Sequence, residues 1–352
     1  MLGFGRSKLL VGLDIGSSAI KAVELKASGK GFAVTAIATE PVPHQSIVDG
    51  AIMDGGAVAA AIRRLFEHKG FRGSDVAASL SGSAVIVKKI SLPAMTEAEL
   101  AQAIYWEAEQ YIPFDINDVS LDFQVLDHAE GAESRGSMDV LLVAAKREKV
   151  ADYTNVIREA GKQPSVVDVD AFALQNAYEA NYGLQSRVVA LVNVGASAIN
   201  INIVFNGQSL FTRDVSLGGN AYTEAVQREL NLPFELAERA KKGVPIDECT
   251  FDDVRPVLQA VTQNVILEIQ KTFDFFKGTV DSDRIDAIVL SGGAAAVDGF
   301  AEALGKRFGI AVESFDPFRL IAVDRIQDAD VAQLAPTSVV AVGLALRKAG
   351  DR

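Results

Sequence analysis

The chain has 352 residues, of which 49% are hydrophobic and 23% are charged, and its formal net charge is −12. This length suits two domains, and the composition is typical of a soluble globular protein. The negative charge argues against nucleic acid as a partner, because phosphate binding requires clustered Lys and Arg. A single cysteine, Cys249, excludes an intrachain disulfide, and three widely spaced histidines do not predict a metal site.

The N-terminal region shows neither a targeting pattern nor a membrane-spanning pattern. Asp14 interrupts the first apolar run before it reaches the length of a signal peptide, and no stretch approaches the ~20 apolar residues that cross a bilayer. We therefore expect a cytoplasmic protein without direct membrane insertion. Any association with a membrane is expected to depend on partners.

The first informative stretch is VGLDIGSSAIK (11–21), which predicts a strand, a tight turn and a second strand. Between its two apolar runs it holds Asp14, Gly16, Ser17 and Ser18. A turn of glycine and serine presents N–H groups and hydroxyls, which is the chemistry that a phosphate requires. The carboxylate would repel that phosphate unless a hydrated Mg²⁺ lies between them, and Lys21 could reach a phosphate oxygen. Alternatively, Asp14 only stabilises the turn through Asx-type hydrogen bonds.

The stretch LPAMTEAELAQAIYWEAEQYIPFD (92–115) predicts a helix. Thr96 and Glu99 form a capping-box pattern at its start, and Pro113 ends it. A strand is predicted further on, over VLLVAAKREKV (140–150). Three aromatic residues of this region either line a partner groove or pack in its own core, and the sequence leaves both interpretations open: Tyr105, Trp106 and Tyr111.

A second stretch, ALVNVGASAIN (190–200), repeats the first and again predicts a strand, a glycine turn and a strand. Asn193 stands where the first copy has Asp14. The identical positions are Gly16 and Gly195, Ser18 and Ser197, Ala19 and Ala198, and Ile20 and Ile199. Two copies of this pattern indicate two related domains that follow one another, and the natural ligand site of such a pair is the cleft between them.

A third glycine turn lies in IDAIVLSGGAAAVDGFAEAL (285–304). An apolar strand is predicted to end at Leu290, the turn is Ser291-Gly292-Gly293, and a helix is predicted from about Asp298. Glycines at such a junction permit close approach of a flat ligand or a phosphate to the backbone. The alternative is a plain strand-to-helix connection that needs glycine only for its geometry.

Together these segments resemble the two phosphate motifs and the adenosine motif of the actin-like ATPase superfamily, which includes actin, the cell-division protein FtsA, sugar kinases and the large heat-shock chaperones. Residues 235–242 (ELAERAKK) are similar to the chaperone helix that touches ribose and adenine. The stretch PTSVVAVGLAL (336–346) resembles the second connecting helix, with Gly343 at a close helix contact. The resemblance implies an α/β actin-like ATPase fold, with two related domains around a nucleotide cleft.

The resemblance also implies ATP and Mg²⁺ as ligands, with Asp14 as the metal-binding residue. The nucleotide-binding residues that it implies are Gly16, Ser17, Ser18, Lys21, Gly195, Ala196, Ser197, Gly218, Gly219, Glu238, Lys241, Lys242, Gly292, Gly293 and Ala294.

Within the superfamily, residues 92–115 and the opening GFGRSKLLVGLDIGSSAIKAVEL are similar to the PilM family of type IV pilus assembly proteins, relatives of FtsA. This likeness implies an FtsA-type subdomain inserted at 84–162. The first actin-like domain would comprise 1–83, 163–187 and 335–352. The second would comprise 188–334, with its outer part at about 220–284.

The PilM likeness implies a place under the inner membrane and the N-terminal cytoplasmic segment of PilN as a partner, bound in a groove beside the inserted subdomain. Other type IV pilus motor and platform proteins are further expected partners. FtsA ends in a basic amphipathic helix, whereas this chain stops at LRKAGDR, so no membrane tail of its own is expected.

The superfamily uses an aspartate in each phosphate motif to hold Mg²⁺ and the attacking water, and Asn193 replaces the second of them. An amide keeps the hydrogen bonding but lacks the charge, so we expect ATP binding with slow or absent hydrolysis. Asp170, with Asp168 in reserve, could compensate; alternatively both cap a helix that begins near Ala171. The candidate catalytic residues are therefore Asp14, Asp170 and Asn193.

Two other functions stay open at this point. A small-molecule kinase of the same fold would need a base for its substrate hydroxyl, and no candidate stands out. A filament-forming cytoskeletal protein like FtsA or MreB is compatible with the sequence.

Overall fold

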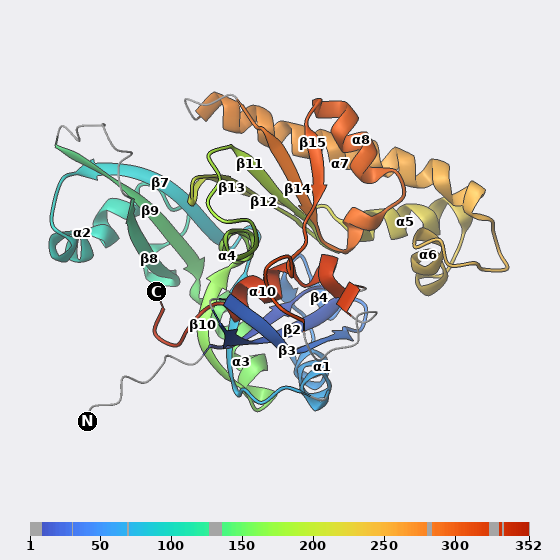
Figure 1. Ribbon diagram of the computed structural model, residues 1–352, viewed down its shortest axis with the longest axis horizontal. Helices are drawn as coiled ribbons and strands as arrows, with labels where there is room; N and C mark the ends of the chain where they lie inside the picture. The colour runs from blue at the N-terminus through green and yellow to red at the C-terminus, as the bar shows by residue number, and fades with distance from the viewer. Residues whose placement is uncertain are drawn as a thin grey trace. The chain divides into compact units, whose positions relative to one another are not determined.

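The computed structural model describes residues 9–29, 31–68, 70–126, 136–279, 284–323, 331–332 and 334–351 (Figure 1). Its contacts divide the chain into two compact units. We call Met1–Gly82 together with Ile157–Asp351 the main unit, and Ser83–Val156 the inserted unit.

The first lobe of the main unit is built on a five-stranded sheet of order β10-β6-β1-β2-β3. Its strands are β1 (Val11–Ile15), β2 (Ala19–Ser28), β3 (Gly31–Pro41), β6 (Asp75–Leu80) and β10 (Gln163–Val169). Its helices are α1 (Gly55–Glu67), α4 (Asp170–Tyr182) and α10 (Val339–Ala345), and the short strands β4 (Ile47–Val48) and β5 (Ala51–Ile52) precede α1. β1 and β6 are almost continuously apolar, and α10 packs on both of them. α1 packs on β2 and β3 of the same sheet (Figure 1).

The second lobe has a sheet of order β13-β12-β11-β14-β15. Its strands are β11 (Val189–Val194), β12 (Ile199–Phe205), β13 (Gln208–Val215), β14 (Ala287–Ser291) and β15 (Ala311–Ser314). Its helices are α5 (Gly219–Leu230), α6 (Phe234–Lys241), α7 (Phe251–Thr279) and α8 (Phe300–Phe308). A 3-10 turn, η2 (Gly293–Ala296), follows β14, so the helix predicted from Asp298 begins two residues later.

The two sheets confirm the predicted repeat. In each, the first strand of the lobe runs antiparallel to the second and parallel to β6 or β14, and the second pairs antiparallel with the third. The turns match at atomic level, since a Cβ on Gly16 would lie 3.0 Å from the Ala19 carbonyl oxygen, and one on Gly195 would lie 3.0 Å from that of Ala198. The chain therefore contains the same β-sheet twice.

Helices α4 and α10 of the first lobe pack on one another. α4 follows β10, α10 lies near the C-terminal end, and Gly343 of α10 presses against the backbone of Ala173 in α4. A Cβ at Gly343 would overlap the Ala173 carbonyl, so only glycine permits this approach. The predicted close helix contact at Gly343 is confirmed.

The inserted unit is a three-stranded antiparallel sheet of order β7-β9-β8 with helices. Its elements are β7 (Val85–Pro93), α2 (Glu97–Glu109), the 3-10 turn η1 (Ile116–Asp118), β8 (Val119–Leu126), β9 (Ser137–Lys146) and α3 (Arg147–Glu159), the last of which runs on into the main unit. The capping box of Thr96 and Glu99 is confirmed at the start of α2. The strand predicted over 140–150 is wrong beyond Lys146, where the charged run of residues 147–149 opens α3.

Among the helices in these described ranges, none combines the length and the apolarity needed to cross a membrane.

Candidate functional site

The tips of the two repeated hairpins meet inside the main unit. Ser17 Oγ lies 2.7 Å from Ser197 Oγ, so the two hydroxyls share a hydrogen bond. Ser18 is exposed next to this contact, and Ala196 is half-buried. The structure thus brings together the two turns that the sequence singled out, although they are separated by 180 positions along the chain.

Asp14 and Lys21 form an ion pair behind the first tip. They are direct cross-strand partners on β1 and β2, and Lys21 Nζ lies 3.0 Å from Asp14 Oδ2. Both side chains are largely buried, and the missing side chain of Gly16 leaves room for the ammonium group, which would lie 3.0 Å from a Cβ there. A cation is therefore held beside the first turn by the carboxylate that the sequence predicted for a metal.

The corresponding position in the second lobe holds a chain of neutral amides that ends on a carboxylate. Asn193 Nδ2 donates to Asn200 Oδ1 (3.0 Å), and Asn200 Nδ2 donates to Asp214 Oδ1 (2.9 Å). Ser291 Oγ donates to Asn193 Oδ1 at 3.3 Å, and the Gly82 N–H donates to Asp214 Oδ2 at 2.6 Å. The bonds all run toward Asp214, and one of the two N–H groups of the Asn193 side chain donates to Asn200.

Asp214 is a site residue that the sequence analysis missed. Asn193, Asn200 and Asp214 are direct partners across β11, β12 and β13, as Asp14, Lys21 and Thr39 are across β1, β2 and β3. The carboxylate thus lies on the first strand in the first lobe but on the third strand in the second lobe. Carrying the repeat one strand further, to the residue opposite Asn200, would have found it.

Asp170, at the first position of α4, lies close to both aspartates. Ser79 Oγ donates to Asp170 Oδ1 at 2.5 Å. The pKa of Asp170 is raised to about 6, first by burial and then by the negative charge of Asp14, with a smaller contribution from Asp214. Hydrogen bonds from Ser79 and Ser81 act against this shift. The capping alternative is wrong for Asp170, because α4 has no side-chain cap and this carboxylate turns to Ser79.

Asp168 lies elsewhere and does not serve as the reserve. It is buried, its Oδ2 lies 3.4 Å from Arg347 Nη1, and its Oδ1 accepts from the Val169 N–H. Burial raises the pKa of Asp168, and the positive charge of Arg347 opposes this shift. Its contacts tie β10 to the C-terminal segment rather than to the hairpin tips.

The loop before α5 lies directly on the second hairpin tip. A Cβ on Gly218 would lie 2.6 Å from the Gly195 carbonyl oxygen and 2.7 Å from that of Ala196, and the Gly219 N–H donates to the Gly195 carbonyl at 2.9 Å. Any larger residue at Gly218 would push this loop away from the tip. The two glycines therefore allow the backbone before α5 to pack directly against the second hairpin tip.

The turn after β14 packs against the end of β11. Gly292 has φ +95°, a conformation that side chains rarely adopt, and a Cβ there would collide with the Val194 backbone. Gly293 is exposed and Ala294 is buried. This turn and the loop before α5 thus meet at the same strand end, next to Asn193.

The α6 residues form a compact charged cluster. Lys241 Nζ donates to Glu238 Oε2 (2.5 Å) and to Thr223 Oγ1 (2.9 Å), and Lys242 Nζ lies 2.9 Å from Glu238 Oε1. Burial alone would raise the pKa of Glu238, but its lysine partners and Thr223 outweigh this and lower it. Burial lowers the pKa of Lys241, against the attraction of Glu238.

A ring contact joins the two lobes at the start of α6. The His44 ring, from the loop after β3, lies 3.9 Å from the Phe234 ring between centroids. Phe234 and Glu238 are one helical turn apart, so they share a face of α6. The face that carries the charged cluster is therefore also the face that the first lobe touches.

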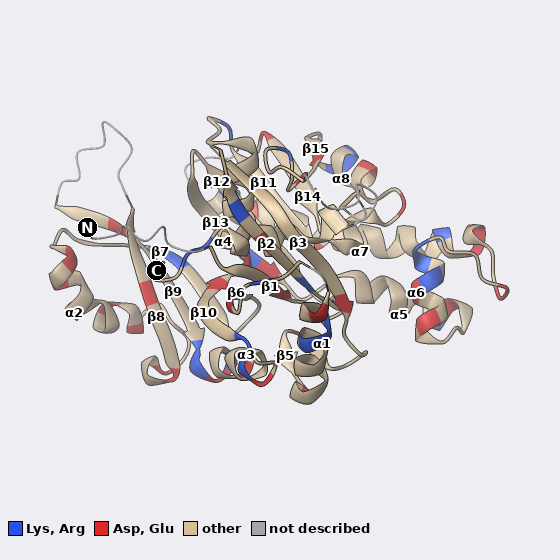
Figure 2. Ribbon diagram, turned by 60° about the horizontal axis from the view of Figure 1, so that its bottom comes forward, with Lys and Arg blue, Asp and Glu red and all other residues tan. Residues whose placement is uncertain are grey.

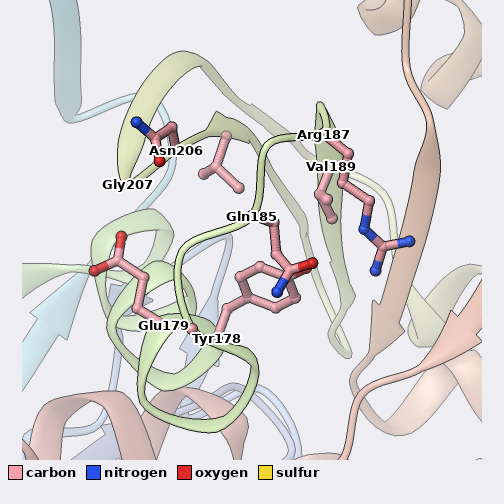
Figure 3. Close-up of a pocket in the computed structure, with 9 residues that line it drawn as sticks. Tyr178, Glu179, Gln185, Arg187, Val189, Asn206 and Gly207 are labelled. Atoms are coloured by element: carbon pink, nitrogen blue, oxygen red, sulfur yellow. The ribbon is translucent and has the colours of Figure 1, made fainter.

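A small cavity of the main unit lies apart from these residues (Figure 3). The end of α4, the segment before β11 and the β12–β13 turn line it, with Tyr178, Glu179, Gln185, Arg187 and Asn206 around it. None of the residues that the sequence analysis assigned to phosphate or adenosine lines this cavity.

Comparison with known families decides what kind of protein this is. The family model of the type IV pilus assembly protein PilM matches residues 12–349. The chain belongs to the PilM family. A solved PilM-PilN type IV pilus biogenesis complex is similar with a TM-score of 0.85 and 31% identity, over 96% of this chain and 98% of that chain.

More distant relatives confirm the predicted actin-like fold of this PilM-family chain. The cell division protein FtsA of Streptococcus pneumoniae is 22% identical, over 89% of this chain and 76% of its own length. The structure of MreB5 from Spiroplasma citri bound to AMPPNP has a TM-score of 0.53 and 13% identity, over 96% of this chain and 94% of that one.

Proposed function

We propose that this protein is a cytoplasmic ATP-binding scaffold of the type IV pilus assembly complex at the inner membrane, and that it holds the N-terminal cytoplasmic segment of PilN. Membership of the PilM family and the likeness to a PilM-PilN complex support the pilus role. The observation that carries the nucleotide role is the meeting of the two Gly-Ser turns at Ser17 and Ser197. Phosphates held there contact both lobes at once.

The residues around the tips fit a triphosphate with Mg²⁺. Across the described parts of the chain, no three His, Cys, Asp or Glu side chains gather into a metal-binding group of their own. Mg²⁺ needs no such cage, because it keeps most of its waters and takes one or two carboxylates together with substrate phosphates. Asp14 would hold the hydrated ion, which when bound offsets phosphate charge, and Lys21 and the turn amides would bind phosphate oxygens.

The protein's own groups favour slow hydrolysis. Asn193 carries no charge, and its amide nitrogen already donates to Asn200. Asp170 is the group best suited to accept a proton from water, because its pKa of about 6 lies near neutral pH. The nucleotide then acts mainly as a clamp that favours the closed arrangement of the lobes, which a partner can sense.

Replacing Asp14 by asparagine is expected to have opposite effects on ATP binding with and without magnesium. With Mg²⁺ the variant loses the group that holds the hydrated ion, and affinity falls about tenfold or more. In EDTA the variant lacks a carboxylate that repels phosphate, and affinity rises. Isothermal titration of ATP in the two buffers measures both.

Asp49→Asn is the matched control for this experiment. Asp49 is exposed and has φ +48°, which asparagine also adopts readily, so this variant should bind like the wild type in both buffers. Equal affinities of wild type and Asp14→Asn in both buffers would show that Asp14 only shapes the turn.

A peptide copying the N-terminal cytoplasmic segment of the cognate PilN is expected to bind the protein, with an affinity that changes when Mg·ATP is present. Thermodynamic linkage requires the peptide to change the affinity for ATP by the same factor. Fluorescence anisotropy of a labelled peptide measures this. Asp14→Asn should bind the peptide in the absence of nucleotide but lose the Mg·ATP effect. Absence of binding at high micromolar peptide rules out the PilN role and leaves the nucleotide role standing.

A further inference from the structure

The outward face of α2 presents two aromatic rings to solvent. The exposed fraction of Trp106 is 79% and that of Tyr105 is 47%. Gln102 and Glu109 are exposed on the same face, each three or four positions from both rings, which is the spacing of neighbours on a helix surface. We call these four residues the α2 face.

The helix does not need these rings in order to fold. Its opposite side buries Leu100, Ile104 and Ala108 against the sheet of the inserted unit, and the capping box fixes its start. Tyr111 packs against that core with Lys88 over its ring, so the interpretation as core residues holds for Tyr111. The same interpretation is wrong for Trp106 and Tyr105.

The charge on α2 restricts what can cover this face. The helix sequence EAELAQAIYWEAE holds four glutamates and no Lys or Arg, and Figure 2 shows only acidic colour along it. An anionic lipid surface or a second copy of the same face would bring negative charges together. A positively charged protein segment is the complementary occupant.

We propose that the α2 face docks a basic segment of another protein. An arginine of that segment stacks on Trp106 and pairs with Glu109, while an adjacent apolar side chain packs on Tyr105. Trp is the strongest aromatic partner for a cation, and a guanidinium can stack on a ring and bond a carboxylate at once. Aromatic residues ringed by polar groups are also the usual centres of protein interfaces.

The test uses the fluorescence of Trp106, which is the only tryptophan in the chain. The probe is a short synthetic peptide that alternates arginine and leucine, and its control replaces arginine by glutamate. Only the arginine peptide is expected to blue-shift and saturate the emission of the full-length protein. Glu109→Lys is expected to weaken this binding about tenfold, since it replaces an attractive charge by a repulsive one.

Glu302→Lys on α8 is the matched control, because it changes the net charge by the same amount at an exposed position outside the α2 face. It should alter the affinity less than about twofold. Circular dichroism checks that both variants are folded. The proposal is overturned if the arginine peptide leaves the emission unchanged, if Glu302→Lys weakens binding as much as Glu109→Lys, or if vesicles of anionic phospholipid give the same shift.

Discussion

Replacing Asp170 by asparagine is expected to stabilise the protein at neutral pH and to abolish phosphate release from ATP. The carboxylate is poorly hydrated and faces the negative charge of Asp14, which together raise its pKa to about 6. An amide of the same shape avoids both penalties. Its oxygen can still accept from Ser79, and its nitrogen can donate to the Ser81 hydroxyl.

The sign of the pH dependence follows from proton binding. An aspartate that titrates at about 6 when folded and at 3.8 when unfolded holds more protons in the folded state between these values. The free energy of unfolding of the wild type therefore falls as pH rises from about 4 to about 6, relative to the variant. Above pH 7 the difference reaches up to about 3 kcal/mol in favour of Asp170→Asn.

Urea unfolding of both proteins at pH 4, 6 and 8 measures this difference, and Asp49→Asn serves as the control for loss of an exposed carboxylate. If the free energy of unfolding of Asp170→Asn exceeded that of the wild type by the same amount at every pH, the raised pKa of Asp170 would be contradicted. Phosphate release is compared in parallel, with Asp14→Asn subtracted as the background. The stability result stands independently of whether the wild type turns over.

Replacing Gly343 by alanine is expected to lower the free energy of unfolding by more than about 3 kcal/mol. Alanine has a helix propensity about 1 kcal/mol more favourable than that of glycine, so propensity alone predicts a gain in stability. Packing decides the sign, because the new Cβ would overlap the Ala173 carbonyl and force α10 away from α4. Both helices also contribute buried residues to one shared hydrophobic core cluster.

Gly278 provides the matched control, since it lies in helix α7 with no heavy atom within 4 Å of the position of a Cβ. Gly278→Ala should be neutral or slightly stabilising in the same urea titration. If Gly343→Ala changed the free energy of unfolding as little as Gly278→Ala, the packing of α10 on α4 would contribute little to the stability of the protein.

Local sequence patterns predicted those parts of the fold that local forces decide. The capping box at Thr96 and Glu99 depends on residues three positions apart, and the glycine turns at Gly16 and Gly195 depend on the backbone conformation of a few neighbours. The repeat could be found because both hairpins keep the same turn. The boundary at Lys146 was missed because the valine and alanine run of β9 continues without a turn residue into the charged start of α3.

Contacts across strands and between lobes could not be predicted from local sequence patterns. Asp214 carries no motif of its own and enters the site only because β13 pairs with β12 in the register that sets it opposite Asn200. Lys21 could be predicted as a ligand of phosphate, but its pairing with Asp14 depends on which residues face each other across the hairpin. Trp106 lies opposite the buried stripe of α2, so its exposure followed from the helical period once the core side of the helix was known.

The amide chain of the second lobe ends on the backbone of Gly82, the last residue before the chain enters the inserted unit. Gly82 follows β6 of the first lobe, so hydrogen bonds connect this segment to Asp214 and, through Asn200, to Asn193 in the second lobe. A movement of Asn193 toward a ligand is therefore expected to strain or break one of these bonds. A change at the second hairpin tip is therefore expected to reach the backbone after β6, which gives the two lobes of the main unit a polar connection besides the contact of their tips.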